Sequence, residues 1–302
     1  MRILFGIFFS LALLVSLYSC DKIDQPFVQI EGLDTSLYEG GNFINYKVPT
    51  FGANTNSLRN VLIEDFTGHT CGFCPPAAER AKVLEENNPN RVFSVAIHAA
   101  PNAAGTGTFQ SVKTSGSKFR RDFTTPEGKG IASYLFNSYG GDGNPVGNIS
   151  RVKPLFLPHQ QWTSYTDSLL QTNLIANVQV ESSFFPGTRG VYIHSEVEFL
   201  AAVDGEFAVV IYAVDNEVID WQKVNITDMP DYKHHNVHIG NVFAGETFGR
   251  TFVNGPVAVG EKFRNDFSYQ LPVDLPKEDM HFLIFVVNKG SEEVLQVIKH
   301  EI

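Results

Sequence analysis

The sequence is poor in cysteine, with three among its 302 residues. Two of them form the one Cys-x-x-Cys pair, Cys71 and Cys74, so the second pair that commonly completes a structural zinc site is missing. Zinc at this pair would need two histidines, such as His69 and His98, to be brought there by the tertiary fold. We therefore expect no metal at the pair and no other cofactor.

Positive charge is also scarce, as are the motifs of two common kinds of active site. The formal net charge is −10, from 23 Lys and Arg against 33 Asp and Glu, which gives no general case for nucleic-acid binding. The sequence has no glycine-rich phosphate loop between a strand and a helix, and no Gly-x-Ser-x-Gly nucleophile elbow. Nucleic acid is therefore not among the expected partners.

The composition is that of a globular protein. Hydrophobic residues make up 43% of the chain and charged residues 19%, which is typical of proteins with packed cores. The length favours two domains over one. Twenty-five phenylalanines favour sheet-rich packing, because aromatic side chains prefer strands.

The first 19 residues are expected to be an export signal. Arg2 precedes an apolar run, residues 3–18, that is short for a membrane-spanning helix and typical of a signal peptide. The run leads into Leu17-Tyr18-Ser19-Cys20, which resembles the lipobox of bacterial lipoproteins. That resemblance implies removal of residues 1–19 and acylation of Cys20, which would anchor the chain in a membrane. The alternative is an ordinary signal peptide followed by an unrelated cysteine.

Residues 57–175 are expected to form an α/β domain, preceded by a lipid-anchored N-terminal segment, residues 20–56, that includes a tether and either a strand or a hairpin. The expected elements are strands Val61–Phe66 and Val92–Ile97 and helices Pro75–Asn87, Ile131–Tyr139 and Trp162–Leu174. The first strand, helix and second strand predict a βαβ unit with parallel strands. The Gly/Thr/Ser-rich stretch at 101–130, with its basic cluster at 118–121, reads as a surface insertion with solvated charges.

Residues 176–302 are expected to form an all-β, immunoglobulin-like sandwich. Short apolar or alternating runs predict strands at 178–184, 191–200, 207–214, 251–253, 262–269, 282–287 and 294–298. About seven short strands over this length are typical of an antiparallel sandwich. The domain boundary falls near residues 173–176.

The Cys-x-x-Cys pair lies between the first expected strand and a helix that starts near Pro75. At a helix start, the first cysteine receives unpaired backbone amides and the positive end of the helix dipole, which stabilise a thiolate. Cys71 is therefore the expected nucleophile, and Cys74 the thiol that resolves a mixed disulfide. A protonated His69 would lower the thiol pKa further; the alternative is that His69 is a solvent-exposed loop histidine.

The surroundings of the pair resemble the active-site strand and turn of thioredoxin-fold proteins. The resemblance implies that Asp65, six residues before Cys71, is a buried acid that assists proton transfer to the second cysteine. It also implies that Pro145 is the cis proline that faces the dithiol, whereas spacing alone would favour an ordinary trans proline. The groove in which a substrate strand would pair is then expected to include Asn144, Phe73 and His69. Gly-Phe replaces the Gly-Pro of thioredoxins, which leaves redox potential and partner choice open.

The order of motifs along the chain resembles the twenty-eight-kilodalton outer-membrane protein family, lipoproteins of bacteroid-type Gram-negative bacteria. The motifs are the lipobox, the run at 65–75, the run at 143–151, and the run at 232–238 followed by a β-rich tail. The resemblance implies a thioredoxin-like domain followed by a sandwich domain on the outer membrane. It implies little about activity.

These patterns lead to two functional hypotheses. The first is an outer-membrane lipoprotein, a candidate thiol-disulfide oxidoreductase, that exchanges thiols and disulfides with envelope or surface proteins through Cys71 and Cys74. The second is a non-catalytic surface binding or adhesion lipoprotein that uses the thioredoxin fold as a scaffold. In the second, the pair is a structural disulfide, which an oxidising compartment would keep closed.

A histidine cluster near the end of the chain stands apart from the cysteine pair. His234, His235 and His238 lie close in sequence, and either a strand or a helix would put the first and third on one face. A metal site is one interpretation, with Asp228 and Asp231 as the nearest acids. The favoured interpretation is that they are loop or edge histidines that pack at a domain contact.

Overall fold

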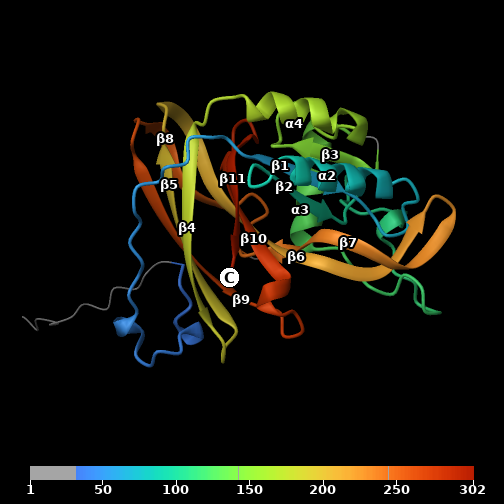
Figure 1. Cartoon of the computed structure of the whole chain (residues 1–302), viewed down its shortest axis with the longest axis horizontal. Helices are drawn as coiled ribbons and strands as arrows, with labels where there is room; N and C mark the ends of the chain where they lie inside the picture. Colours follow the sequence, from blue (N-terminus) through green and yellow to red (C-terminus); the bar gives the residue numbers. More distant parts are fainter. Residues whose placement is uncertain (1–31, 142, 244) are drawn as a thin grey trace, which may run out of the picture. The chain divides into compact units, whose positions relative to one another are not determined.

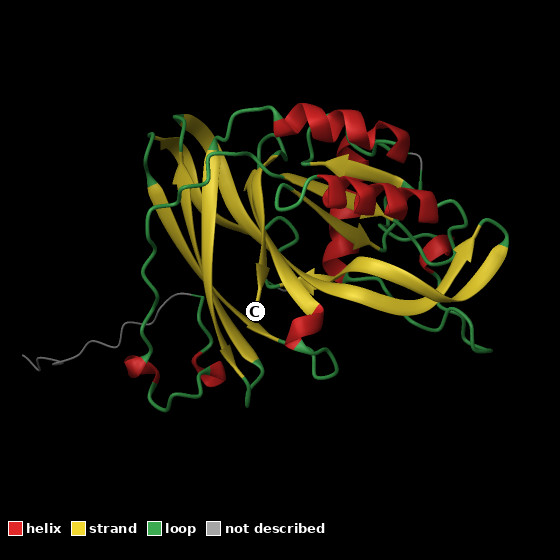
Figure 2. Ribbon diagram, in the orientation of Figure 1, coloured by secondary structure: helices red, strands yellow, loops and turns green. Residues whose placement is uncertain are grey.

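The computed structural model describes residues 32–141, 143–243 and 245–302. The expected signal peptide, Cys20 and the rest of residues 20–31 lie outside the described residues. Figure 1 labels the elements and Figure 2 shows that strands predominate over helices. In the ranges described, no helix is both long and apolar enough to cross a membrane.

The first elements have the bounds that the sequence predicts: β1 (Val61–Phe66), α2 (Pro75–Asn87) and β2 (Val92–Ile97). β1 and β2 are parallel, as expected for a βαβ unit. α2 tolerates prolines in its first turn because the N–H groups there have no partner within the helix. Its buried face, Ala77, Ala81 and Leu84, packs against β1 and β2 and shares a core with Trp162.

Two further helices and one strand complete this half. They are α3 (Pro126–Tyr139), β3 (Val146–Ile149) and α4 (Trp162–Leu170), and β3 is antiparallel to β1. α3 begins before the expected Ile131 because Thr125 caps it: the Thr125 Oγ1 accepts a hydrogen bond from the Gly128 N–H at 2.9 Å. Short 3₁₀ helices lie at Thr35–Leu37, Phe43–Asn45, Thr108–Gln110, His159–Gln161 and Lys277–Asp279.

The second half is built of strands. They are β4 (Ala176–Phe185), β5 (Gly190–Phe199), β6 (Val203–Val224), β7 (Thr227–Asn241), β8 (Arg250–Val257), β9 (Lys262–Gln270), β10 (Met280–Asn288) and β11 (Val294–Glu301). All seven expected strands are present. β7 was not expected, and β6 continues from its expected end at Val214 to Val224. Together β6 and β7 form a long hairpin that reaches to the right in Figure 1, below α2.

Two sheets contribute to the core of this half. One has the order β4-β5-β9, and the other has the order β11-β10-β6-β7-β2-β1-β3, with β8 also paired to β6. The buried cluster between them draws side chains from both sheets, among them Ile193, Phe199, Phe207, Phe267 and Phe282. The expected two-sheet packing of this half is therefore present.

The larger sheet crosses the expected domain boundary. β7 joins β2 through the parallel pair of Val237 and Ala96. A second buried cluster mixes the halves, with Leu62 and Ile97 from one and Tyr212 and Phe285 from the other. Residues 57–175 and 176–302 therefore differ in secondary structure but share a sheet and a core.

A buried ion pair also links the halves. Arg151, just after β3, donates from Nε and Nη2 to the Glu64 carboxylate of β1 at 2.9 and 2.7 Å. Tyr212 of β6 accepts from the Arg151 Nη2 and donates to Glu64, both at 2.8 Å. The two-point geometry and the tyrosine hydroxyl offset part of the penalty of burying both charges.

The part of the N-terminal segment that is described, residues 32–56, contains neither of the expected elements, a strand or a hairpin. Its aromatic side chains instead pack against the three-stranded sheet, with Tyr46 and Phe43 against Tyr192. The Tyr46 hydroxyl lies 2.6 Å from the His194 Nε2. Aromatic packing and hydrogen bonds made by side chains, not strand pairing, hold this segment.

Candidate redox site

Cys71 and Cys74 form a disulfide at the N-terminal end of α2, with their Cα atoms 5.4 Å apart. The Cys74 N–H donates to the Cys71 carbonyl at 3.3 Å, and the Cys74 carbonyl accepts from Ala77 and Ala78 in the first turn of α2. The pair therefore has the strand–turn–helix setting that the sequence predicts. Both cysteines are only 1% exposed, whereas Phe73 between them is 74% exposed.

One flank of the cysteine turn is held by the segment at 108–111. The Thr70 N–H donates to the Phe109 carbonyl, and the Thr70 hydroxyl donates to the Thr108 carbonyl, both at 3.1 Å. The Gln110 amide donates to the Thr67 carbonyl at 2.8 Å.

The other flank is held by the end of the β6–β7 hairpin. The Lys223 N–H donates to the His69 carbonyl, and the Asn225 N–H donates to the Gly72 carbonyl, both at 2.8 Å. The turn that carries the cysteines is thus bonded on both sides by segments distant in sequence. The sequence did not predict that the hairpin would bind the cysteine turn, because it did not predict strand β7.

Asp65 lies on β1 and is 2% exposed, as the thioredoxin resemblance implies. Its Oδ1 has no hydrogen-bond partner, and burial raises the pKa of the carboxyl to about 8. It lines a small cavity together with Cys74, His98 and His234. A carboxyl group that changes charge near neutral pH therefore faces the same space as the second cysteine.

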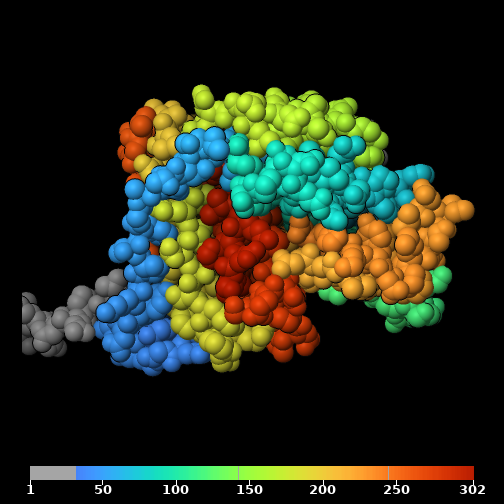
Figure 3. Space-filling model, viewed as in Figure 1, coloured from blue at the N-terminus to red at the C-terminus, as the bar shows by residue number. Residues whose placement is uncertain are grey.

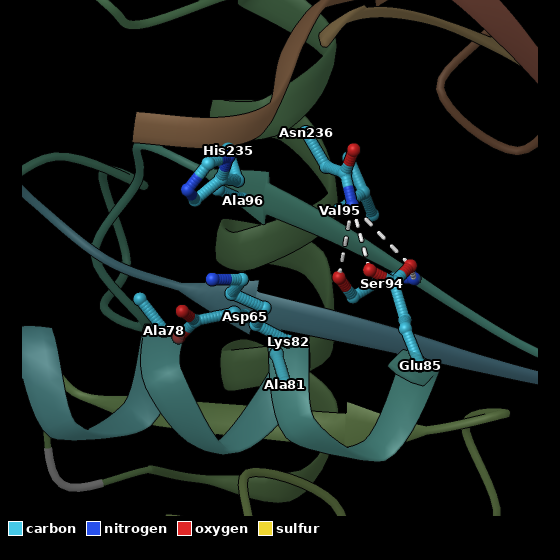
Figure 4. Close-up of a pocket in the computed structure, with 10 residues that line it drawn as sticks. All are labelled: Asp65, Ala78, Ala81, Lys82, Glu85, Ser94, Val95, Ala96, His235 and Asn236. Carbon is cyan, nitrogen blue, oxygen red and sulfur yellow. Dashed lines mark hydrogen bonds between the residues drawn. The ribbon is translucent and has the colours of Figure 1, made fainter. Parts of the chain in front are cut away.

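A neighbouring pocket also reaches Asp65, as Figure 4 shows. Ala78 and Ala81 of α2 line one side, and His235 and Asn236 of β7 line the other. Deeper in the pocket, the Asn236 amide donates to the Glu85 Oε2 at 3.0 Å and to the Ser94 hydroxyl at 3.2 Å. β7 thus forms one wall of the approach to the buried acid.

The peptide bond between Asn144 and Pro145 is cis, which agrees with the thioredoxin resemblance. Asn144 is fixed through both ends of its side-chain amide. Its Nδ2 donates to the Ala99 carbonyl at 2.9 Å, and its Oδ1 accepts from Gln110 at 3.1 Å. The Lys153–Pro154 bond, for which we had no expectation, is also cis.

Both interpretations of His69 need correction. His69 is buried, so it is not an exposed loop histidine; its Nε2 lies 3.0 Å from the Ser111 carbonyl and its ring contacts Phe119 and Phe123. Burial lowers the pKa of His69, which favours the neutral ring. A charged imidazole that stabilises the Cys71 thiolate is therefore not what this environment provides.

Two more histidines, His98 and His234, lie at the site, and no sequence pattern clearly predicted that they would be there. His98 follows β2 and stacks on Phe123 with ring centres 4.5 Å apart, and His234 of β7 lies 4.7 Å from the same ring. Burial holds the pKa of His98 well below its usual range and lowers that of His234 to about 4. The His98 Nδ1 and the His234 Nε2 have no hydrogen-bond partner. The one available clue was that His98 ends a strand parallel to the strand that precedes the cysteines.

The three clustered histidines lie in strand β7, not in a loop. His234 and His238 are buried and His235 is exposed. His238 bonds to the Thr125 hydroxyl at 2.9 Å and to the Asn241 Oδ1 at 3.0 Å. Within the described ranges, no three His, Cys, Asp or Glu side chains are grouped so that they could hold a metal ion. His234 and His238 pack where the two halves meet.

The basic residues of the insertion, Lys118, Arg120 and Arg121, are exposed, as expected, but two of its phenylalanines are not. Phe119 and Phe123 are buried, and the Lys118 Nζ lies 5.1 Å from the ring centre of Trp221 and 3.0 Å from the Asp228 carboxylate. Both partners belong to the β6–β7 hairpin, so the insertion is fastened to it.

Comparison with known proteins yields likeness in structure only. No family model matches the chain, and no curated protein matches it. The solved structure of HBP35 of Porphyromonas gingivalis is similar with a TM-score of 0.61 and 16% identity, over 82% of this chain and 77% of that one. Protein AGR_C_4864 from Agrobacterium tumefaciens gives a TM-score of 0.51 and 13% identity, over 82% and 96%. Both likenesses indicate a shared fold over most of this chain.

A domain of the outer membrane lipoprotein Omp28 from Porphyromonas gingivalis is also similar in part. Its TM-score is 0.27 at 18% identity, over 42% of this chain and 87% of that domain. A score of this size does not define a shared fold.

Proposed function

We propose that this chain is an envelope lipoprotein that exchanges thiols and disulfides with other envelope or surface proteins. One observation carries the proposal: the Cys71–Cys74 disulfide lies at the N-terminal end of α2 and shares a cavity with the buried acid Asp65. Parallel β1 and β2 joined by α2, with antiparallel β3 beside β1, support a thioredoxin-like unit. The lipobox-like sequence at Cys20 supports attachment to the outer membrane.

In the reduced protein, the Cys71 thiolate would attack one sulfur of a partner's disulfide. A mixed disulfide forms, and the partner's other sulfur leaves as a thiolate. Cys74 then gives up its proton and attacks the Cys71 Sγ, which releases the partner as a dithiol and closes the Cys71–Cys74 bond. Two electrons pass from this chain to the partner, and the reverse sequence returns them.

Asp65 is suited to take the Cys74 proton in the second step. Proton transfer is most effective when the pKa values of donor and acceptor are close to each other and to the working pH. Burial raises the pKa of Asp65 to about 8, near the value of about 8.5 for a free thiol. An ordinary aspartate, with a pKa near 3.9, would be a much weaker base.

The proposal is tested by trapping the mixed disulfide. Reduced Cys74→Ser protein lacks the resolving thiol, so Cys71 should form a lasting mixed disulfide with oxidised glutathione. Cys71→Ser is the matched control, because its remaining thiol is the resolving one and should react far more slowly. Mass spectrometry of the intact protein detects the adduct. Equal, negligible labelling of both variants, with the β6–β7 hairpin intact and with its outer part removed, would show that Cys71 is not a nucleophile.

The second candidate function is a binding or adhesion protein with a structural disulfide. The burial of both cysteines favours it, because a closed, buried pair is what a structural role requires. It predicts that the double variant Cys71→Ser, Cys74→Ser loses about 2–4 kcal/mol of stability. It also predicts that neither single variant forms a glutathione adduct.

A further inference from the structure

The outer part of the β6–β7 hairpin is a two-stranded arm. β6 pairs with β10 as far as Asp215, and beyond that residue it pairs with β7. We call residues 216–236 the arm. An isolated pair of strands is marginally stable in water, so the position of the arm depends on what it rests on.

The tip of the arm rests on the cysteine turn, through backbone groups that a strand would use. Lys223 and Asn225 donate their N–H groups to the carbonyls of His69 and Gly72, both at 2.8 Å. The Gln222 side-chain amide donates to the Cys71 carbonyl at 3.0 Å and to the Gly68 carbonyl at 3.3 Å. The arm therefore occupies the carbonyl groups along one flank of the turn.

The surroundings of Gly72 show how closely the tip of the arm approaches the cysteine turn. Its φ lies outside the left-handed region, so its backbone does not require glycine. A Cβ at this position would nevertheless collide with the Asn225 carbonyl oxygen. Gly72 therefore leaves the room that the tip of the arm needs beside the Cys-x-x-Cys motif. Figure 3 shows the orange surface of the arm against the teal surface of the region that holds β1 and α2.

The arm is fastened differently at its two ends. At the base, Val218 and Val237 form a buried apolar cluster with Phe123. At the tip, Ile226 is 94% exposed, and the bonds to the turn are polar. Between them, Trp221 contacts Phe119 and Lys118. An apolar base with a hydrogen-bonded tip permits the tip to lift while the base stays in place.

We propose that the arm is a lid that shields the Cys71–Cys74 disulfide and lifts from the cysteine turn when a partner polypeptide docks. The proposal rests on the proposed function. Exchange needs an incoming sulfur in line with the S–S bond, which a pair that is 1% exposed does not permit. An extended partner segment can offer its own backbone N–H groups to the carbonyls that the tip releases.

The lid is tested by the rate at which dithiothreitol reduces the disulfide, a step that makes two protein thiols and one cyclic disulfide of the reagent. Gln222→Ala removes the side-chain amide from the tip, and loss of one net hydrogen bond should speed reduction about fivefold. Gly72→Ala should displace the tip and speed reduction about tenfold or more. Lys233→Ala is the matched control, because Lys233 is an exposed arm residue that pairs with Glu217, away from the tip. Its rate should equal that of the unaltered chain.

A shortened arm separates the lid from any change in the motif's own chemistry. Residues 220–232 are replaced by Asn-Gly, which joins Ile219 to its cross-strand partner Lys233 through a two-residue turn. This variant should be reduced fast, and adding Gly72→Ala should change its rate little, because the carbonyl that the Cβ meets is gone. Circular dichroism confirms that each variant is folded.

The outcomes separate the lid from the exchange function. If the unaltered chain, Gln222→Ala and the shortened arm are all reduced readily and at one rate, the lid is overturned while the exchange function is unaffected. If the shortened arm, Gln222→Ala and Gly72→Ala are all reduced faster than the unaltered chain and Lys233→Ala is not, the lid is supported. If the shortened arm resists reduction as fully as the unaltered chain, the arm is not the barrier, and the glutathione trap then decides on the exchange function separately.

Discussion

Asp65 is the single residue whose surroundings bear most directly on the proposed exchange. It lies on the central strand pair of the first half, beneath α2, and one carboxylate oxygen has no partner. Removal from water without a compensating cation disfavours the charged form, which raises the pKa to about 8. Burying this acid costs stability, and the proton transfer at Cys74 that we propose would be a function that outweighs the cost.

The ionisation of Asp65 predicts a pH-dependent effect of Asp65→Asn. Between about pH 4 and pH 8 the folded state keeps the proton that the unfolded state has lost, so the free energy of unfolding falls as pH rises. Asparagine does not ionise, so the variant does not have this pH-dependent loss of stability. Its advantage over the unaltered chain should be near zero at pH 4 and on the order of 4 kcal/mol at pH 8.

Urea unfolding across this pH range measures the difference. Asp231→Asn, at an exposed acid of the same hairpin, is the control and should show no such trend. An advantage for Asp65→Asn that is equal at pH 4 and pH 8 would contradict the assigned ionisation.

Single residues were predictable where a local pattern or a motif defines them. Asp65 and Pro145 stand at fixed positions relative to the cysteines, and the structure buries one and gives the other a cis bond. His69, His98 and His234 were not predictable, because their burial depends on Phe119 and Phe123 from a long loop. No local periodicity records such a contact.

At the scale of elements, regular patterning decided what could be predicted. β1, α2 and β2 have clear apolar periodicity and formed with the expected bounds. β7 has three histidines, Pro230 and few apolar residues, so its sequence reads as a loop. It is a strand because β6 pairs along its whole length and β2 meets it at Val237. Tertiary pairing overrode local preference.

The start of α3 gives a prediction at this scale. The Thr125 hydroxyl accepts from the Gly128 N–H and also bonds to the His238 ring, both at 2.9 Å. Thr125→Ala should therefore lower the free energy of unfolding by about 1–2 kcal/mol. Thr124→Ala is the control, because its hydroxyl bonds to Asp122 at an exposed site and should matter by less than about 0.5 kcal/mol. Chemical denaturation compares the two, and equal losses would show that the cap contributes nothing special.

At the scale of the molecule, the two halves are joined more closely than their sequences suggest. The change from mixed α/β patterning to strands near residue 176 is real, but the sheet and a buried cluster continue across it. Residues of the ion pair, Glu64, Arg151 and Tyr212, are scattered along the chain, so no sequence window contains the link. Composition and length could suggest two domains, but they could not show that the two halves share a sheet and a buried core.

Because the halves share a sheet and a core, we predict that the chain unfolds in a single cooperative transition. Arg151→Met leaves the Glu64 carboxylate buried without its cation, and should cost about 3–5 kcal/mol. Lys289→Met, which breaks the more exposed pair with Glu206, is the control and should lower the free energy of unfolding far less. Tryptophan fluorescence and far-ultraviolet circular dichroism should change together during unfolding. Two separated transitions would show that the halves are independent.

The central claim, that the cysteine pair exchanges disulfides, is tested most directly by equilibrating the purified chain with glutathione buffers. The fraction of Cys71 and Cys74 in the thiol form is measured by quenching, alkylation and mass spectrometry. We predict a reversible, two-electron dependence on the ratio of squared reduced glutathione to oxidised glutathione. A pair that stays fully closed in every buffer, with the arm intact or shortened, would contradict the account.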